Sequence, residues 1–522
     1  MGAGLVTERD AKPPRQAKAP SWRLTAPDNV LTQGLVVSGF SSLPYAQALF
    51  LCFGWATTEE KGRWLQALQE VAPITDADGG ERRTAAIAFS YTGLERHGLN
   101  REALASFSRP FQQGMYQEDR LRRLGDRFDG AWQGTVIKDG PRWSGNTVPR
   151  DADGNGPPVV TPTTVHALLL LYAREKTEVN DWAQAVEMTL ASHNVAVVHK
   201  RALDLQFDHN IAREHFGFAD GLSQPLPYGD SVIMSNGDKS ERDNWHGVPL
   251  GEILFGHRNV HHEDAPGPIV KDDDIARAAN LSQAGAPVGF LNFGRNGSYL
   301  VVRELHQYVA EFWGALEDAA AKIRKQERDA TYITADWLAE RIVGRDIDGN
   351  LLCPGGTLPP NKYDMPQNDF GFFDDDRYGL GCPLGSHVRR ANPRDSLAKN
   401  ENAKQTLLNA ANSHRILRRA RKFGPPPTRR DANDNQERGL LFMCLNTDIA
   451  RQFEFVQQTW ILNKNFATLF DETDPLVGPA GPFTVPQQPL RRIVDVRTFI
   501  QMAGGEYFFL PSIPALNYLA LL

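Results

Sequence analysis

A unit of one strand followed by one helix occurs twice in this 522-residue chain and restricts its fold more than any other feature. The first copy has an apolar run of strand length, residues 46–55, before a helix with apolar residues at helical spacing. The second copy has the apolar run 440–445 before a helix predicted over 449–462. The letters LFLC and LFMC occupy matching places in the two runs. The repeat indicates two halves of similar topology.

Further apolar runs and helical patterns extend this interpretation. Residues 85–91, 165–173 and 195–198 have the composition of strands, and 180–192 and 308–325 have helical spacing. Strands and helices in this order predict an α+β fold, with helices on one face of an antiparallel sheet.

The domain boundaries follow from where these patterns stop. We expect a mobile N-terminal tail over 1–40, a first domain over 41–227, a loop-rich connection over 228–268 and a second domain over 269–522. Residues 421–438 are rich in proline and charge, which predicts a surface insertion or flexible loop.

Composition excludes several classes of protein. Charged residues make up 23% and apolar residues 41%, as in ordinary globular proteins, and the net charge of -6 argues against a nucleic-acid partner. No apolar run reaches the roughly 18 residues of a membrane-spanning helix. The N-terminus shows neither an apolar export segment nor a twin-arginine pair, so we expect a cytoplasmic protein. Monomer and homo-oligomer both remain open.

One glycine-punctuated stretch, residues 381–394, combines a histidine with three arginines and reads GCPLGSHVRRANPR. Glycine and proline make it a loop or a turn that leads into a helix, so His387 could point into a cavity. A neutral imidazole is the usual proximal ligand of iron in haem peroxidases. Arg389 and Arg394 are candidates to bind the two propionates. The alternative is a surface loop with a solvated basic cluster.

The four cysteines, at 52, 353, 382 and 444, are scattered, without a C-x-x-C pair or a C-x-x-C-H haem attachment site. We therefore expect reduced thiols and a haem bound without covalent attachment. Cys382 is an alternative iron ligand, although no nearby helix N-terminus supports a thiolate there.

Three other stretches accompany the histidine loop. Residues 214–225 read EHFGFADGLSQP and contain Gly-x-x-Asp-Gly, residues 416–419 read ILRR, and residues 439–445 read GLLFMCL. In identity, order and approximate spacing, the set resembles the dye-decolorizing peroxidase family from about Ala46 to the C-terminus. The resemblance implies two ferredoxin-like α+β domains, with haem held mainly by the second.

The resemblance also implies roles for individual residues. Asp220 would be the distal acid–base and Arg418 the distal cation, with Arg419 as the alternative register. Leu440 and Phe442, which share one face of a strand, would cover the distal haem edge. The ordinary interpretations are an Asp-Gly turn, a solvated basic face and core packing.

Two further positions complete the predicted site. An acidic residue should orient His387 through its second nitrogen. The resemblance places this residue near Asp471, Glu472 and Asp474, among which we favour Asp474. Trp460 closes an apolar stripe on the helix over 449–462, which by itself indicates core packing. The resemblance adds a possible role as an oxidation site that relays electrons from bulky dyes.

Together these features predict a haem b peroxidase that uses hydrogen peroxide to oxidise phenols and bulky dyes. The rival interpretations are a haem carrier and a protein that releases haem iron. Asp220 together with Arg418 favours the peroxidase, since a carrier needs neither.

Overall fold

The structure is a computed structural model that describes residues 21–522, except 56, 80–81, 146–162, 206, 209–210, 354–355, 358–367, 369 and 488–490. Residues 1–20 of the predicted tail therefore lie outside the described residues. Downstream of them, strand β1 (Trp22–Leu24) pairs with β13 (Val232–Met234). In the described ranges, no helix has the length and apolar character needed to cross a membrane.

The first half has the β-α-β-β-α-β order of a ferredoxin-like unit. Its four strands are antiparallel to their neighbours and lie in the order β9-β2-β8-β3. The predicted strands and helix are confirmed, with longer bounds for most of them. The six elements are β2 (Tyr45–Phe53), α2 (Trp64–Val71), β3 (Arg83–Ser90), β8 (Ala167–Ala173), α7 (Lys176–Ala191) and β9 (Val195–Asp204).

The second half repeats this order and contributes the adjacent strands β21-β22-β17-β25. Its elements are β17 (Ser298–Gln307), α9 (Val309–Gln326), β21 (Arg421–Phe423), β22 (Gly439–Asn446), the helical segments η5 (Ala450–Glu454) and η6 (Val456–Ile461), and β25 (Ile500–Leu510). The helix predicted over 449–462 is present, but it is a π-helix. Its backbone bonds span five residues, from Glu454 N–H to Ile449 and from Leu462 N–H to Gln457.

The two halves join at both edges. Strand β9 pairs with β21, and β3 pairs with β25, so the pairings close into a ring of eight strands. The expected fold of two ferredoxin-like units is thereby confirmed. One prediction is wrong: residues 421–423, placed in a surface loop, are a buried strand. The reason is that this short strand bridges the edges of β9 and β22.

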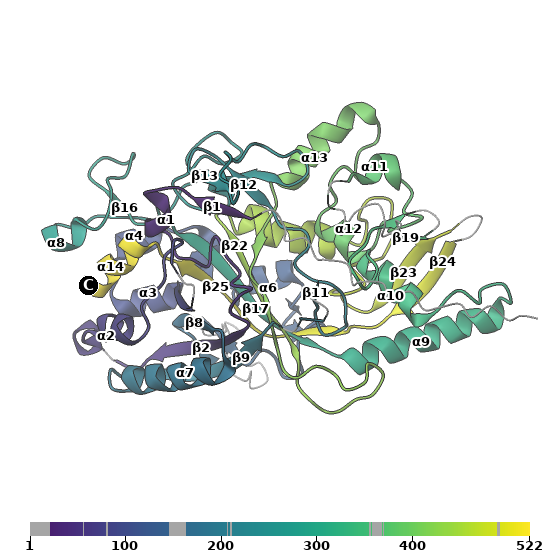
Figure 1. Ribbon diagram of the computed structural model, residues 1–522, viewed down its shortest axis with the longest axis horizontal. Helices are drawn as coiled ribbons and strands as arrows, with labels where there is room; N and C mark the ends of the chain where they lie inside the picture. Colours follow the sequence, from purple (N-terminus) through teal and green to yellow (C-terminus); the bar gives the residue numbers. More distant parts are fainter. Residues whose placement is uncertain are drawn as a thin grey trace, which may run out of the picture.

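Successive side chains in the ring point to opposite faces. Phe50 and Val302 are buried inside the ring, whereas Leu49 and Val301 belong to the outer core, which also includes side chains of the surrounding helices. Figure 1 shows α2 and α7 on one side of the molecule and α9 on the other. Between α9 and β21 lies a long insertion that carries α10 (Ala335–Val343) and α12 (His387–Ala391). This insertion faces β17, β22 and β25 across the candidate site.

Candidate active site

A cavity of about 320 Å³ lies between the insertion and the strands of the second half. Its lining comes from the turn at 214–223, from α12, from η6 and from β17, β22 and β25. Most of the predicted site residues border it: Asp220, His387, Arg394, Arg418, Leu440 and Phe442. A largely apolar cavity with a few converging polar groups is the usual form of a ligand site.

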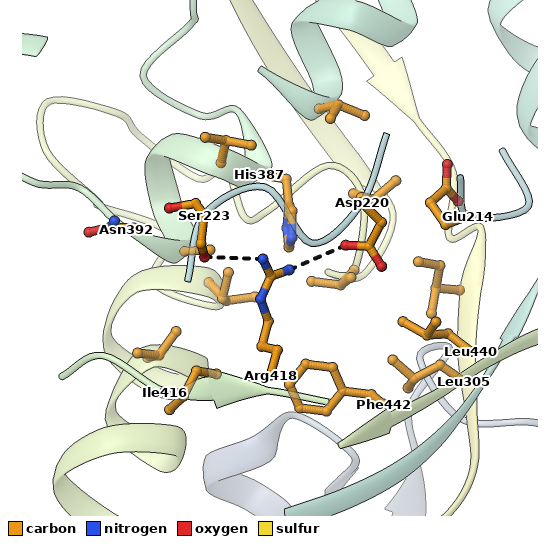
Figure 2. Close-up of a pocket in the computed structure, with 18 of the residues that line it drawn as sticks. Glu214, Asp220, Ser223, Leu305, His387, Asn392, Ile416, Arg418, Leu440 and Phe442 are labelled. Carbon is orange, nitrogen blue, oxygen red and sulfur yellow. Dashed lines mark hydrogen bonds and ion pairs between the residues drawn. The ribbon is translucent and has the colours of Figure 1, made fainter. Parts of the chain in front are cut away.

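His387 is the first residue of α12 and faces this cavity (Figure 2). Its Nδ1 lies 2.9 Å from Oδ2 of Asp474, whose side chain is fully buried. The other oxygen of Asp474 accepts the N–H groups of Leu476 and Val477. The carboxylate is thus fixed in place, and the second nitrogen of the imidazole remains available on the cavity side.

The environment keeps Asp474 ionised. Burial by itself would raise the pKa of Asp474, but attraction to His387 and its hydrogen bonds outweigh burial and hold the pKa below its usual range. The two other acidic candidates are engaged elsewhere. Asp471 is an exposed partner of Lys464, and Glu472 accepts from Thr484.

Asp220 and Arg418 face His387 across the cavity, as Figure 2 shows. Nη1 of Arg418 lies 3.5 Å from Oδ1 of Asp220, and Nη2 donates to the carbonyl of Ser223. The backbone N–H of Arg418 donates to Gln224, which fixes the strand against the turn that carries Asp220. Each side chain of the pair keeps about a third of its surface uncovered. A carboxylate and a guanidinium therefore share one open wall of the cavity.

The neighbouring wall is apolar apart from Arg303, which pairs with Asp126. Leu440 and Phe442 on β22 stand directly opposite Leu305 and Arg303 on β17, and all four line the cavity. Since residues two apart in a strand share a face, the predicted pair Leu440 and Phe442 does point into the site. These side chains exclude water from the space beside Asp220 and Arg418.

The two predicted propionate ligands have different surroundings. Arg394 lines the cavity and donates to the carbonyls of Asn368 and Phe370. Arg389 does not line it. Its guanidinium is fully buried, donates to the carbonyls of Asp376 and Cys382, and is stacked over a phenylalanine ring. The structure therefore does not bring Arg389 to the cavity, because its guanidinium is held in the loop core.

Trp460 does not border the cavity either. It is 6% exposed and packs edge-on against Phe455 and His414, of which His414 does line the cavity. Its position in the core agrees with the apolar stripe in the sequence. It contacts the lining residue His414, and its neighbour in the chain, Ile461, also lines the cavity.

Sequence reasoning missed several charged groups of the cavity, among them Arg415 and Glu214. Arg415 is buried there, and burial, reinforced by Arg418, lowers the pKa of Arg415 to about 10. Glu214 opens the turn that ends at Asp220. Neither has a pattern that distinguishes it from ordinary polar residues, so only proximity in the folded chain identifies them.

The residues present suit a haem. An imidazole held by a buried carboxylate is the expected axial ligand, and an apolar wall with arginine at its border suits a macrocycle with carboxylate substituents. Cys382 is not an alternative ligand, because it is 2% exposed, does not line the cavity, and burial raises its pKa to about 11. Fold and site together define an α+β protein with a cavity that suits a haem, in which Asp220 and Arg418 face His387.

Comparisons with known proteins agree with this class. No model of a protein family matches the chain. The multifunctional dye peroxidase of Amycolatopsis sp. is 30% identical over 383 residues, which cover 68% of this chain and 71% of the relative. The crystal structure of a DyP-type peroxidase from Anabaena sp. has a TM-score of 0.68 at 24% identity and covers 94% of each chain. A dye-decolorizing peroxidase in complex with 2,6-dimethoxyphenol has a TM-score of 0.67 at 23% identity, with 95% of this chain and 100% of that chain covered.

The chain belongs to the dye-decolorizing peroxidase family, and by class it is a haem-dependent peroxidase.

Proposed function

We propose that this enzyme binds haem b through His387 and uses hydrogen peroxide to oxidise phenols and bulky dyes. The observation that carries the proposal is the His387–Asp474 pair facing Asp220 and Arg418 across one apolar cavity. Non-covalent haem b is supported by the absence of a C-x-x-C-H segment in the sequence. The names of the relatives, and the dimethoxyphenol bound to one of them, support dyes and phenols as reductants.

A bound haem supplies the redox chemistry, and the residues of this chain bind it and move the proton. Asp220 takes the proton from peroxide and later returns it to the departing oxygen. Arg418 stabilises the negative charge that develops on that oxygen in a site from which Leu440 and Phe442 exclude water. Arg394 is the remaining candidate among the predicted residues for binding a propionate.

Trp460 is the proposed relay for substrates too large for the cavity. Its indole contacts His414, which borders the cavity, so an electron has a short path inward. Because Trp460 is almost fully buried, a bulky dye would have to donate through the protein surface that covers the indole.

One experiment tests the proposal as a whole. The protein reconstituted with haem should show a Soret band that changes when hydrogen peroxide is added, and it should then oxidise 2,6-dimethoxyphenol. The absence of a Soret band would contradict every haem function. A stable Soret band without a response to peroxide would favour a carrier, for which the Asp220–Arg418 pair has no use.

A further inference from the structure

Glu214 is a cavity-lining carboxyl that the proposed mechanism does not use. Three donors converge on it. The backbone N–H groups of Phe216 and Phe218 each lie 2.8 Å from one of its oxygens, and Nε2 of Gln307 donates over 2.6 Å. Figure 2 shows Glu214 on the same side of the cavity as Asp220. The carboxyl thus forms the centre of the turn that ends at Asp220.

The contacts of Glu214 connect two distant parts of the chain. Phe216 and Phe218 are buried in the core under α9, with Gly217 between them at a φ of 106° that only glycine adopts readily. Gln307 is the last residue of β17, the strand that also supplies Arg303 and Leu305 to the cavity wall. Glu214 therefore ties the Asp220 turn to the sheet of the second half.

Gln307 can hold Glu214 in either protonation state. All three neighbours in the structure are donors, so a proton on Glu214 would lack an acceptor. In the described part of the chain, Oε1 of Gln307 is buried without a hydrogen-bond partner. Rotation of the amide would turn this oxygen toward Glu214 and accept its proton. An arginine or lysine in the place of Gln307 could donate to the ionised carboxylate but could not accept the proton of the neutral acid.

The surroundings favour the neutral acid at mildly acidic pH. Burial, reinforced by the charge of Asp220, outweighs the three hydrogen bonds and raises the pKa of Glu214 to about 7. Lys422 on β21 also interacts electrostatically with Glu214. His215, the next residue in the chain, is instead hydrogen-bonded through Nε2 to the carbonyl of Phe423. Burial lowers the pKa of His215 to about 4, so His215 stays neutral over the same range.

We propose that Glu214 is a positioning residue for the peroxide reaction: with Gln307 it holds the Asp220 turn against β17, and its ionised form opposes the negative charge that develops on peroxide. The inference rests on the proposed peroxidase function. Below its pKa Glu214 is neutral, and Asp220 beside Arg418 is the carboxylate that acts on peroxide. Above that pKa, the ionised Glu214 is a second anion near Asp220. The peroxide reaction should therefore slow as pH rises through neutrality.

The test measures the rate constant for the reaction of the haem-loaded enzyme with hydrogen peroxide, by stopped flow, from about pH 5 to about pH 9. The wild-type rate should fall about tenfold, the effect of one added charge in a partly buried site. Glu214→Gln keeps an acceptor for the turn without titrating, so its rate should stay level. Glu214→Ala loses the tie and should be slower at every pH.

The matched control is Glu340→Gln. Burial also raises the pKa of Glu340 to about 7, but this residue does not line the cavity, so its variant should keep the wild-type profile. The wild type should lose protonated-carboxyl infrared absorption near neutral pH, and a component of that change that is missing in Glu214→Gln but retained in Glu340→Gln would support the assignment without any kinetics. This infrared measurement tests the assignment even if Glu214→Ala does not fold.

The results separate this inference from the proposed function. A wild-type enzyme that binds haem but does not react with peroxide contradicts the function itself. A wild type that reacts, with the same alkaline decline in Glu214→Gln, overturns the role of Glu214. A wild type without any decline between these pH values overturns it equally.

Discussion

Arg418 and Arg419 are neighbours in the chain, yet their guanidinium groups lie in different environments. Arg418 lines the cavity beside Asp220, whereas Arg419 is half-buried and donates to the carbonyls of Leu35 and Val36. We expect Arg418→Leu to slow the peroxide reaction by about 10²–10³. Arg419→Leu should keep that rate and lower the free energy of unfolding by about 1–3 kcal/mol, because the two carbonyls lose their donor. Stopped-flow kinetics and urea unfolding of both variants measure this, and the reverse pattern would assign the role to Arg419.

Asp220 offers a second test at the scale of one side chain. Its Oδ1 accepts the N–H of Gly221, a bond that the amide oxygen of Asn can also accept. Asp220→Asn should therefore keep the turn and bind haem normally, but lose about 10²–10⁴ in the rate of the peroxide reaction, since the base is gone. Haem content and stopped-flow rates are measured on the same sample. Unchanged reactivity would remove Asp220 from the mechanism.

Asp474 is hydrogen-bonded to His387 and does not itself line the cavity. Replacing it by Asn should weaken haem binding about 10–100-fold, because the imidazole loses its anionic partner. The pKa of Asp474 lies below its usual range, so its contribution to stability is present above the unfolded value and is lost only as pH falls through the lowered one. Haem titration at neutral pH measures the effect. Asp471→Asn is the control. It changes an exposed carboxylate that pairs with Lys464, so this variant should bind haem like the wild type.

At the scale of an element, the π-helix after β22 determines where Trp460 lies. Its bonds to the fifth residue turn Trp460 toward Phe455 and His414, while Val456 and Gln457 border the cavity. π-Helices often occur at functional sites. A π-helix has more residues per turn than an α-helix, so different side chains share a face. The apolar stripe predicted from α-helical spacing therefore matches this segment only in part.

For Trp460→Phe we expect slower oxidation of bulky anthraquinone dyes, by about tenfold, while small phenols and peroxide react as in the wild type. Phenylalanine retains most of the packing against Phe455 and Phe466, so the fold should persist. Steady-state kinetics on a dye and on 2,6-dimethoxyphenol measure the two activities. Equal losses on both substrates would indicate a damaged core, and equal retention would mean that Trp460 carries no electrons.

At the scale of the whole molecule, a buried charge cluster inside the ring links the two halves. Glu304 on β17 has no exposed surface and accepts from Trp143, His199 and Arg201, of which the last two belong to β9. Burial would raise the pKa of Glu304, but these donors hold it well below its usual range. The carboxylate therefore remains ionised, and its contribution persists into the acidic range in which we expect the enzyme to work.

Glu304→Gln should lower the free energy of unfolding by about 3–5 kcal/mol, because it removes the fully buried charge that pairs with Arg201 and His199. The same difference should appear at neutral pH and at about pH 5, since the lowered pKa lies below both. Urea unfolding at the two pH values measures it. Asp336→Asn, which breaks an exposed pair with Arg430, should cost no more than about 1 kcal/mol. A difference between wild type and Glu304→Gln that vanishes at about pH 5 would contradict the ionised carboxylate.

Local patterns in the sequence determined much of this protein. Apolar runs and helical spacing depend on neighbours a few residues apart, so the strands of both halves and α7 and α9 were predictable. The same holds for the identity of His387, Asp220 and Arg418 as candidates, because each lies in a distinctive short segment.

Only the tertiary structure decided which side chains meet. His387 and Asp474 are 87 residues apart, and Arg418 and Asp220 are 198 apart, so no local pattern could select Asp474 from three acids or turn Arg389 away. Glu214 gains its raised pKa from burial among distant residues. Closure of the ring likewise depends on the pairing of β21 with β9. The charged and proline-rich sequence from residue 421 on had predicted a loop there. Hydrogen bonds and desolvation act between groups that are close in space. Groups far apart in the sequence become close only when the chain folds.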